Sequence, residues 1–334
     1  MIDGIYTLAN DGVADQLMAL LNSIEVNAGK PYPVCVIAFD DRIERVREIV
    51  ASRPHVTLMD DPEIFGRWED FSTRVWQTHP SALTTWQAQG INGVYRLGSN
   101  HRYAAFDFAA PFDRFIYLDA DTLVLSSLEV FFTALDQHDF VVYDFQFKDP
   151  AHIFNVQSDR LWQQFPHEQV ESEIFCAGCY ASKRGLFPTE QRDWLVEQLA
   201  SGDAELLYMG APNQSVLNYM ALRSKVGVHN LALHLPVSQR AGNSVTSSHF
   251  HMRDDRLYDR EAALTYLHYI GLSSRLFRAV CAGENIDFPY RELFLHYRFL
   301  HEARPMLVGK PVAYNAPPSF SDRLLRKLGL ASAR

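Results

Sequence analysis

The sequence predicts an α/β fold built around a doubly wound, mainly parallel sheet. Short apolar runs alternate with amphipathic segments along the first half of the 334-residue chain, and 47% of the residues are hydrophobic, which is enough to fill a substantial core. In such sheets, ligands bind outside the carboxyl ends of the strands. The residues that follow each predicted strand are therefore the first candidates for a functional site.

Four strands are expected before residue 120, with helices between the first three. The strands are short apolar runs at residues 2–9, 33–39, 55–59 and 114–118. Apolar residues recur at helical spacing over residues 13–24, and residues 41–50 place charges on one helix face and apolar side chains on the other. This alternation predicts that the strands run parallel.

The second half of the chain predicts further strands and a change of character near its end. Strands are expected at residues 140–145 and 175–182, and helices at residues 192–200 and 213–223. Residues 247–271 are rich in histidine and tyrosine and predict a hairpin or meander around Asp254 and Asp255, while the end of the chain is helical and basic. We therefore expect a core over residues 1–235 and a smaller extension over residues 236–334.

The composition argues against several classes of protein. A formal net charge of -9 and a pI near 5.8 give no attraction to a nucleic-acid backbone. We find no N-terminal targeting segment and no run of about 20 apolar residues, so we expect a cytoplasmic protein. The cysteines are too few for a disulfide scaffold, and the single Cys-x-x-Cys, at Cys176 and Cys179, is expected to be buried on a strand.

Two aspartates end the fourth predicted strand. In FIYLDAD, residues 115–121, Asp119 and Asp121 share one face if the strand stays extended. Like charges at close range repel each other unless a cation lies between them, and Mg²⁺ or Mn²⁺ accepts carboxylate oxygens while keeping positions for phosphate oxygens. The pair therefore predicts a site for a metal ion and a diphosphate. The alternative is a turn or a helix cap that includes Asp121 and Thr122.

The segment around this pair resembles the core of the family-8 glycosyltransferases, the family of glycogenin and of bacterial lipopolysaccharide galactosyltransferases. The matching residues are Arg102, Asp113, Arg114, Tyr117, Leu118, Asp119 and Asp121. Weaker matches follow in the family's order at residues 9–14, 175–179, 213–218 and 268–271, which read ANDGVA, FCAGC, NQSVLN and HYIG. The resemblance covers residues 4–275, with faint similarity between the motifs.

This resemblance implies a GT-A fold, which is Rossmann-like, and a retaining, metal-dependent glycosyltransferase. Such an enzyme moves a hexose from a UDP-sugar to a glycan, a glycolipid or a small-molecule acceptor. The metal, Mn²⁺ or Mg²⁺, would be held by Asp119, Asp121 and a distant histidine, which the motif HYIG places at His268.

The resemblance also implies roles for other residues. Asn10 and Asp11 would lie near the uracil and ribose, and Gly178 where the backbone passes close to the donor sugar. The residues implied to bind the nucleotide-sugar are Leu8, Ala9, Asn10, Asp11, Arg102, Asp119, Ala120, Asp121, Gly178, Gly271 and Arg275. The catalytic residues implied are Arg102, Asn213 and Gln214, with Gln214 at the reacting face of the anomeric carbon.

The sequence departs from the family pattern at four positions that bear on the donor. Val13 stands near the position of the tyrosine that stacks on uracil, Cys176 replaces an asparagine, and Asn213 replaces an aspartate. Arg275 stands near the family's lysine, where an arginine fork is able to hold a diphosphate. The alternative for Arg275 is a solvated helix residue.

Several alternatives remain open from the sequence. His249 and His251 compete with His268 for the metal. The aromatic residues at 63–98 either flank an acceptor sugar or pack between helices. Residues 319–334 form a basic amphipathic segment that either contacts anionic lipid on the inner face of a membrane, which implies a lipid-linked acceptor, or docks on the protein.

Two other functions compete with a glycosyltransferase. A haloacid-dehalogenase-like phosphatase also has an Asp-x-Asp after an apolar strand, but its motif opens the domain and is completed by a Gly-Asp-x-x-x-Asp that this chain lacks. An inactive or non-catalytic nucleotide-sugar-binding relative is the other alternative, because Cys176 and Asn213 depart from the pattern.

Overall fold

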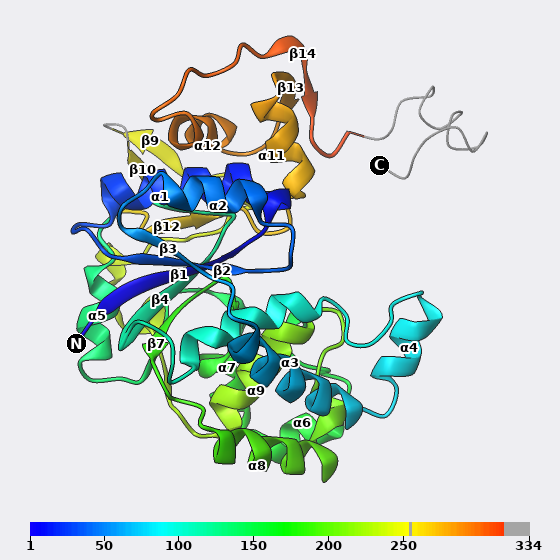
Figure 1. Cartoon of the computed structure of the whole chain (residues 1–334). Helices are drawn as coiled ribbons and strands as arrows, with labels where there is room; N and C mark the ends of the chain where they lie inside the picture. The colour runs from blue at the N-terminus through cyan, green and yellow to red at the C-terminus, as the bar shows by residue number, and fades with distance from the viewer. Residues whose placement is uncertain (254–255, 317–334) are drawn as a thin grey trace.

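A seven-stranded, mainly parallel sheet forms the centre of the computed structural model, which describes residues 1–253 and 256–316 (Figure 1). The strand order is β3-β2-β1-β4-β7-β6-β8. β7 runs antiparallel to both of its neighbours, and the other neighbouring pairs are parallel. The strands are β1 (Asp3–Ala9), β2 (Val34–Ala38), β3 (Val56–Met59), β4 (Arg114–Asp119), β6 (Phe140–Val142), β7 (Cys179–Lys183) and β8 (Val228–Asn230). The predicted doubly wound α/β sheet is therefore present.

Helices cover both faces of this sheet (Figure 1). One face packs against α1 (Ala14–Asn27), α2 (Glu44–Ala51) and α5 (Glu129–Leu135). The other packs against α3 (Pro62–Gln77), α6 (Asp159–Gln164), α7 (His167–Glu173), α8 (Thr189–Ala200) and α9 (Pro212–Arg223). α4 (Ala82–Ala88), α10 (Leu231–His234) and a 3₁₀ segment at Leu97–Phe106 complete the core.

Side chains of β1 alternate between the two faces. Tyr6 and Leu8 join the apolar cluster that contains α3, α8 and α9, whereas Ile5 and Ala9 join the cluster that contains α1 and α2. Because both faces are covered, every residue of β1 after Asp3 is buried. This explains why the strand is continuously apolar in sequence.

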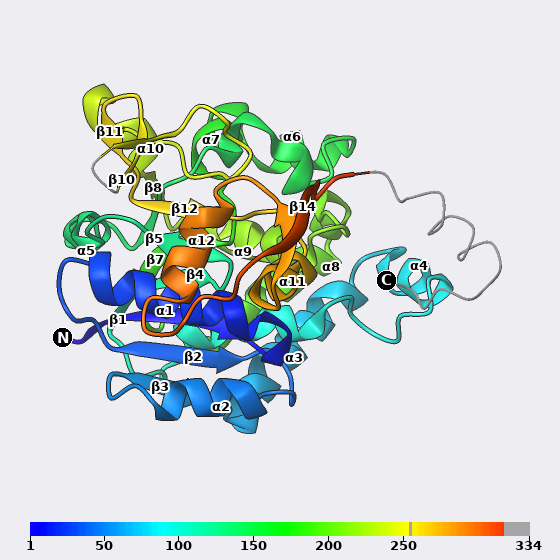
Figure 2. The ribbon, with the colours of Figure 1, turned by 90° about the horizontal axis from the view of Figure 1, so that it is seen from above.

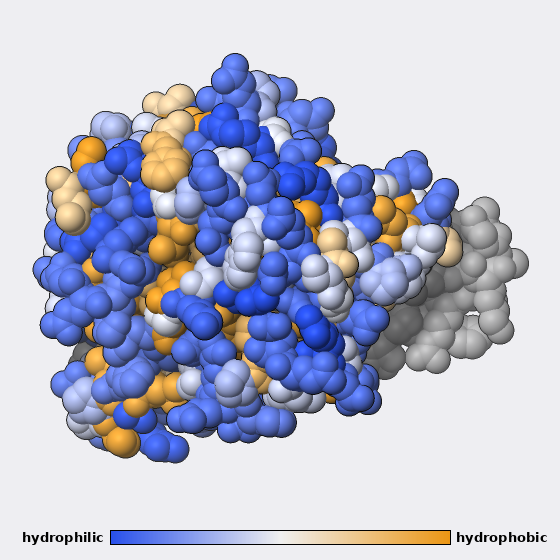
Figure 3. Space-filling view, turned by 90° about the horizontal axis from the view of Figure 1, so that it is seen from below, coloured by the Kyte–Doolittle hydropathy of each residue, from blue (hydrophilic) through white to orange (hydrophobic). Residues whose placement is uncertain are grey.

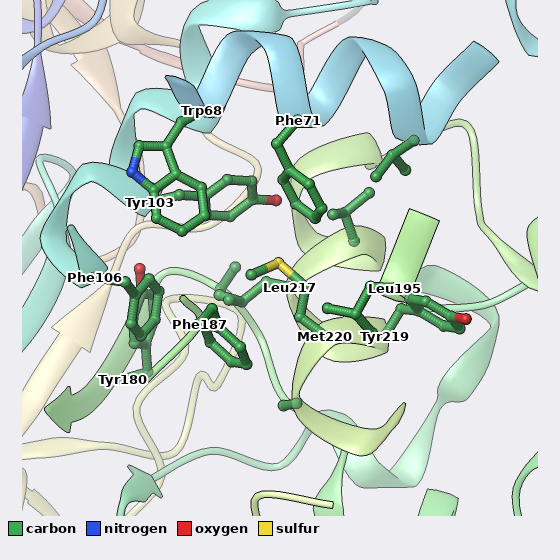
Figure 4. Close-up of a cluster of buried hydrophobic side chains, with 14 of the residues drawn as sticks. Trp68, Phe71, Tyr103, Phe106, Tyr180, Phe187, Leu195, Leu217, Tyr219 and Met220 are labelled. Atoms are coloured by element: carbon green, nitrogen blue, oxygen red, sulfur yellow. The ribbon is translucent and has the colours of Figure 1, made fainter. Parts of the chain in front are cut away.

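Most of the aromatic residues at 63–98 lie in the core. The buried ones include Trp68, Phe71, Trp76 and Trp86. Figure 4 shows Trp68 and Phe71 extending from α3 toward the side chains of the underlying layer. The packing alternative therefore describes these four residues, whereas Tyr95 is partly exposed.

The C-terminal extension lies beyond α1 and has its own apolar cluster (Figures 1 and 2). The predicted meander is β9 (His251–Arg253), β10 (Arg256–Asp259) and β11 (Ala262–Ala263). It is followed by α11 (Ser274–Cys281), β13 (Glu284–Asp287), α12 (Arg291–Arg298) and β14 (Val308–Ala313). Asp254, Asp255 and the basic segment at 319–334 lie outside the described residues, and the boundary at residue 235 stays a prediction.

One strand pairing connects the extension to the end of β4. β5 (Thr122–Val124) follows the second aspartate and pairs antiparallel with β12 (Tyr266–His268), so that His268 lies opposite Thr122. The residues between β4 and β5, Ala120 and Asp121, form a turn. The condition that the strand stays extended through Asp121 is therefore not met, and the backbone turns between the two aspartates.

The surface and the cysteines complete the description. The face seen in Figure 3 is mostly hydrophilic, and its apolar residues gather in separate areas. No helix within the described ranges is long and apolar enough to cross a membrane. Cys179 is buried on β7 as predicted, whereas Cys176 precedes that strand and is partly exposed.

Candidate functional site

The ends of β1 and β4 bring two polar segments to one edge of the sheet. These strands are parallel neighbours, and Leu8 of β1 lies beside Asp119 of β4. Asn10 follows β1, and its side-chain oxygen accepts a hydrogen bond from Gly12 N at 3.0 Å. After β1 the next strand of the sheet, β2, lies on one lateral side, and after β4 the next strands, β6 and β7, lie on the other, and this reversal of strand order is where a ligand crevice opens.

Asp119, Asp121 and His268 lie together at this edge. One ligand atom of each side chain lies within 4.8 Å of the other two. Asp119 and Asp121 flank the turn after β4, and the β5–β12 pairing carries His268 to the same point, where its Nε2 is 3.3 Å from Asp121 Oδ1. His249, one of the competing histidines, is exposed and contacts Asp259 instead, at 3.1 Å. The structure thus brings together the three residues that the resemblance implies as metal ligands.

Within this cluster, Asp121 and His268 stabilise each other's charged forms. Burial alone would lower the pKa of His268, but the nearby Asp121 carboxylate raises it well above its usual value. Burial alone would raise the pKa of Asp121, but His268 lowers it. Two carboxylates and an imidazole form a donor set that suits Mn²⁺, which takes both oxygen and nitrogen ligands.

Gly178 permits this position of His268. A Cβ at residue 178 would lie 2.3 Å from His268 Cε1 and 2.9 Å from its Nδ1, closer than Cβ atoms approach other atoms in real structures. The resemblance predicts that the backbone at Gly178 passes close to the donor sugar. In the structure, the backbone there passes close to the histidine ring.

Arg102 and Tyr117 fix the first aspartate. Tyr117 donates a hydrogen bond to Asp119 Oδ1 at 2.8 Å, and Arg102 Nη2 lies 3.2 Å from the same oxygen. Arg102 is buried, donates to Ala177 O at 2.8 Å, and stacks on Tyr117 with its guanidinium carbon 4.9 Å from the ring centre. Burial alone would lower the pKa of Arg102, but Asp119 and the surrounding tyrosines raise it, so the guanidinium stays charged.

A cavity of about 300 Å³ opens beside these groups. It is lined by Leu8, Ala9, Asn10, Val13, Gln16, Phe39, Arg96, Ser99, Arg102, Asp119, Ala120, Asp121, Leu272 and Ser274. Gln16 Oε1 and Ser99 Oγ are buried and have no hydrogen-bond partner within the described part of the chain. Unpaired buried polar atoms are costly, so their presence favours a polar ligand in this cavity.

Some residues implied by the resemblance lie outside this cavity. Asp11 directs its carboxylate to α2, where Oδ1 accepts a hydrogen bond from Val46 N at 3.1 Å. Gly271 and Arg275 are exposed and do not line the cavity, although Ser274 does. The solvated alternative therefore describes Arg275 in this structure.

The side chain of Gln214 and the backbone oxygen of Asn213, at the start of α9, form hydrogen bonds with neighbouring segments. Gln214 Oε1 accepts a hydrogen bond from Ala177 N at 3.0 Å, and its Nε2 donates to His152 O at 3.2 Å. Asn213 is buried, and its carbonyl oxygen accepts a hydrogen bond from the Tyr103 hydroxyl at 2.6 Å. Both therefore connect α9 to the segments that border the metal-ligand cluster.

Sequence analysis did not identify Arg96, Gln16 and Ser99. Gln16 lies in the first turn of α1, directly after the predicted turn at the end of β1. Its position near the carboxyl end of a parallel strand indicates a candidate ligand contact. Arg96 precedes the 3₁₀ segment with a φ of 55°. A left-handed arginine has no sequence signature, and such backbone strain is often found at functional sites.

Comparisons with known proteins show a shared fold. The sequence matches no protein-family model and no curated protein. The WbbM bifunctional glycosyltransferase in its apo form gives a TM-score of 0.52 at 14% identity, covering 89% of this chain and 49% of that chain. This chain thus spans about half of WbbM.

Two further structures match more weakly. The galactosyltransferase LgtC with donor and acceptor sugar analogues gives a TM-score of 0.47 at 16% identity, covering 84% of this chain and 95% of LgtC. Mouse xyloside xylosyltransferase 1 gives a TM-score of 0.48 at 13% identity, covering 69% of this chain and 85% of that chain. The central sheet and the match to WbbM confirm the predicted α/β fold of the GT-A, Rossmann-like type, whereas membership of family 8 stays a prediction.

Proposed function

We propose that this chain is a metal-dependent glycosyltransferase that uses a nucleotide-diphosphate-sugar donor. The observation that carries the proposal is the convergence of Asp119, Asp121 and His268 within 4.8 Å beside a polar cavity at the carboxyl ends of β1 and β4. The fold that the chain shares with a glycosyltransferase supports the proposal. The finer assignment, a retaining transfer of a hexose from a UDP-sugar to a glycan, glycolipid or small-molecule acceptor, rests on the family resemblance.

In this proposal, Asp119, Asp121 and His268 hold Mn²⁺ or Mg²⁺. When bound, the metal supplies positive charge that offsets the charge developing on the departing diphosphate. Arg102 and Tyr117 hold one oxygen of Asp119 in place. The cavity would take the nucleotide, with polar contacts from Asn10, Gln16 and Ser99.

Gln214 would contact the donor sugar in this proposal. Its side-chain oxygen accepts a hydrogen bond from Ala177 N and retains a second lone pair for a donor-sugar hydroxyl. Cys176 and Asn213, close to Gln214 in the motifs, depart from the family pattern. This makes the non-catalytic binder the alternative that the experiment has to separate.

The first prediction tests the metal and the activity. Purified protein should release UDP slowly from at least one UDP-hexose in the presence of Mn²⁺, and Asp121→Asn should abolish this release because it removes one anionic ligand. His268→Ala should lower turnover at least about tenfold, a loss usual for perturbed metal sites. His249→Ala is the matched control and should behave as wild type.

The outcomes separate the candidates. Turnover that is unchanged in Asp121→Asn would contradict the proposal. Mn²⁺-dependent binding of UDP without release of sugar from any UDP-hexose would identify a non-catalytic binder. Equal protection from unfolding by UDP, GDP and ADP would show that only the diphosphate is recognised. The anomeric configuration of the released or transferred sugar, followed by NMR, tests retention.

A further inference from the structure

A second cavity, of about 310 Å³, lies at the opposite edge of the sheet. Its lining includes Phe187, Pro188 and Thr189, which follow the end of β7, and Lys183 of β7 pairs with the first residue of β4, Arg114. The metal-ligand cluster stands at the other end of β4. The cavity therefore belongs to neither the metal cluster nor the proposed nucleotide site.

Aromatic residues form much of the wall of this second cavity. Trp68, Phe106, Phe108 and Phe187 line it. Figure 4 shows Trp68, Phe106 and Phe187 grouped where α3 approaches the sheet. Phe108 is 68% exposed and stands at the mouth. Walls of this kind suit an apolar or aromatic body.

Arg192, in the first turn of α8, lines the same cavity and is only 8% exposed. Its guanidinium lies over Trp68, with the central carbon 4.4 Å from the ring centre. It donates to Thr189 Oγ1 at 3.0 Å and, more weakly, to Arg67 O at 3.4 Å. Its Nε is buried and has no hydrogen-bond partner within the described residues.

Arg192 forms no ion pair with any carboxylate that the structure describes. Asp107 is the carboxylate that lines the cavity, and it accepts two hydrogen bonds from Arg67, of 2.9 and 3.1 Å. Burial lowers the pKa of Arg192, and Asp107 opposes this only in part. The other buried arginines differ, because Arg102 is paired with Asp119 and Arg298 with Asp15. Buried charges are normally paired, so an unpaired one needs a reason.

The amino end of α8 adds a second positive feature. This twelve-residue helix has Pro188 at its N-cap and no side-chain hydrogen bond at the cap. The first backbone N–H groups of a helix have no partner within the helix, and the helix dipole favours an anion there. Pro188 and Thr189 line the cavity, so these groups lie at its border.

We propose that this cavity binds a small monoanion, a carboxylate carried on an aromatic or other apolar body. Arg67 and Asp107 neutralise each other, which leaves the single positive charge of Arg192 for the ligand. A monocarboxylate matches that charge and the planar guanidinium, whereas a phosphate dianion would add excess negative charge beside Asp107. The site is independent of the proposed glycosyltransferase activity.

The test uses 3-phenylpropionate as the probe, with titration calorimetry on the full chain. We expect saturable binding, and binding at least about tenfold weaker for acetate, for inorganic phosphate and for the uncharged 3-phenylpropanol, because each lacks the apolar body or the matching charge. Arg192→Met should weaken binding of the probe at least about tenfold. It should also raise the melting temperature of the ligand-free protein, because it removes an uncompensated buried charge.

Two further variants make the result decisive. Arg74→Met removes a cation of α3 that pairs with Asp193 of α8 at 2.7 Å, and it should leave probe binding unchanged. Phe108→Glu changes an exposed side chain at the mouth and should weaken binding by repelling the carboxylate, which tests the site even if Arg192→Met does not fold. Absence of probe binding, undiminished binding in Arg192→Met or Phe108→Glu, or tighter binding of phosphate than of the probe would overturn the proposal.

Discussion

At the scale of single residues, the contact between Gly178 and His268 decides whether the third ligand reaches the aspartates. Gly178→Ala would place a Cβ 2.3 Å from the buried imidazole, which has to move away from Asp121. We expect the Mn²⁺ requirement for donor hydrolysis to rise and turnover to fall at least about tenfold. Gly66→Ala on α3 is the control, because a Cβ there meets nothing within 4 Å. Unchanged Mn²⁺ dependence in Gly178→Ala would contradict this role.

Asp144 predicts a pH dependence of stability. It is 4% exposed, and burial raises its pKa from 3.8 to about 7, although backbone N–H groups of Gln146 and Cys176 oppose the shift. Because the folded state binds this proton more tightly, the contribution of Asp144 to stability is lost as the pH rises from 4 to 7. At 1.36 kcal/mol per unit, the loss is at most about 4 kcal/mol.

Urea unfolding of wild type and Asp144→Asn between pH 4 and pH 8, with a chelator present, measures this effect. Asparagine keeps one of the two backbone hydrogen bonds, so the variant loses a constant amount at every pH. The unfolding free energy of the wild type should fall by about 2–4 kcal/mol more than that of the variant over this range. Parallel pH profiles would show that Asp144 ionises normally.

The sequence predicted the residues that carry charge better than those that only complete the cavity. Asp119 and Asp121 follow an apolar strand, and their spacing signals a paired role. Ser99 carries no such signal, because a buried serine resembles any polar residue of a helix, and Gln16 is indicated only by its position after the turn that ends β1. Asp11 fits a family motif and Arg275 stands near the position of the family's lysine, but a motif does not determine where a flexible side chain points.

At the scale of elements, α9 holds the backbone that leads to Gly178. Asn218 donates to Phe175 O at 2.8 Å, and its Oδ1 accepts from Phe175 N at 2.9 Å. Asn218→Ala leaves both backbone groups buried without partners, which should cost about 2–4 kcal/mol of unfolding free energy. Asn155→Ala loses two hydrogen bonds, of 3.0 and 3.3 Å, at an exposed position where water replaces them, and should cost under about 1 kcal/mol.

Urea unfolding of both variants checks this expectation. Equal losses in the two variants would contradict a special role for Asn218. Gln214 accepts a hydrogen bond from Ala177 N, in the same backbone segment that Asn218 holds. Displacement of this segment in Asn218→Ala should therefore also lower turnover.

Six strands of the main sheet were predicted, whereas the short edge strand β8 and the β5–β12 pairing were not. β1, β2 and β4 are continuous apolar runs whose burial on both faces is visible in the sequence. β5 has only three residues, and its partner follows more than 140 positions later. The hydrophobic pattern of a short strand does not specify which distant strand it pairs with. The pairing that places His268 beside the aspartates is therefore seen only in the structure.

At the scale of the whole molecule, the extension that carries His268 is anchored on α1. Asn22 of α1 donates to Tyr297 O of α12 at 2.6 Å, and Arg298 Nε lies 2.9 Å from Asp15 Oδ1. Figure 2 shows α12 crossing over α1. The proposed metal site is therefore composite, with two ligands from the core and one from a segment held by a separate interface.

This arrangement predicts coupling between that interface and the metal. Arg298 and Asp15 are 7% and 6% exposed, and Asp15 keeps a second partner, Arg45, at 2.7 Å. Breaking a buried pair costs about 3–5 kcal/mol, so Arg298→Met should lose about 2–3 kcal/mol because Arg45 remains. Loosening α12 should also raise the Mn²⁺ concentration needed for donor hydrolysis several-fold, although Arg298 does not contact the metal ligands. Urea unfolding and Mn²⁺ titration measure the two effects, with the exposed Arg278→Met on α11 as control. A loss of stability with no change in Mn²⁺ requirement would show that the β5–β12 pairing alone positions His268.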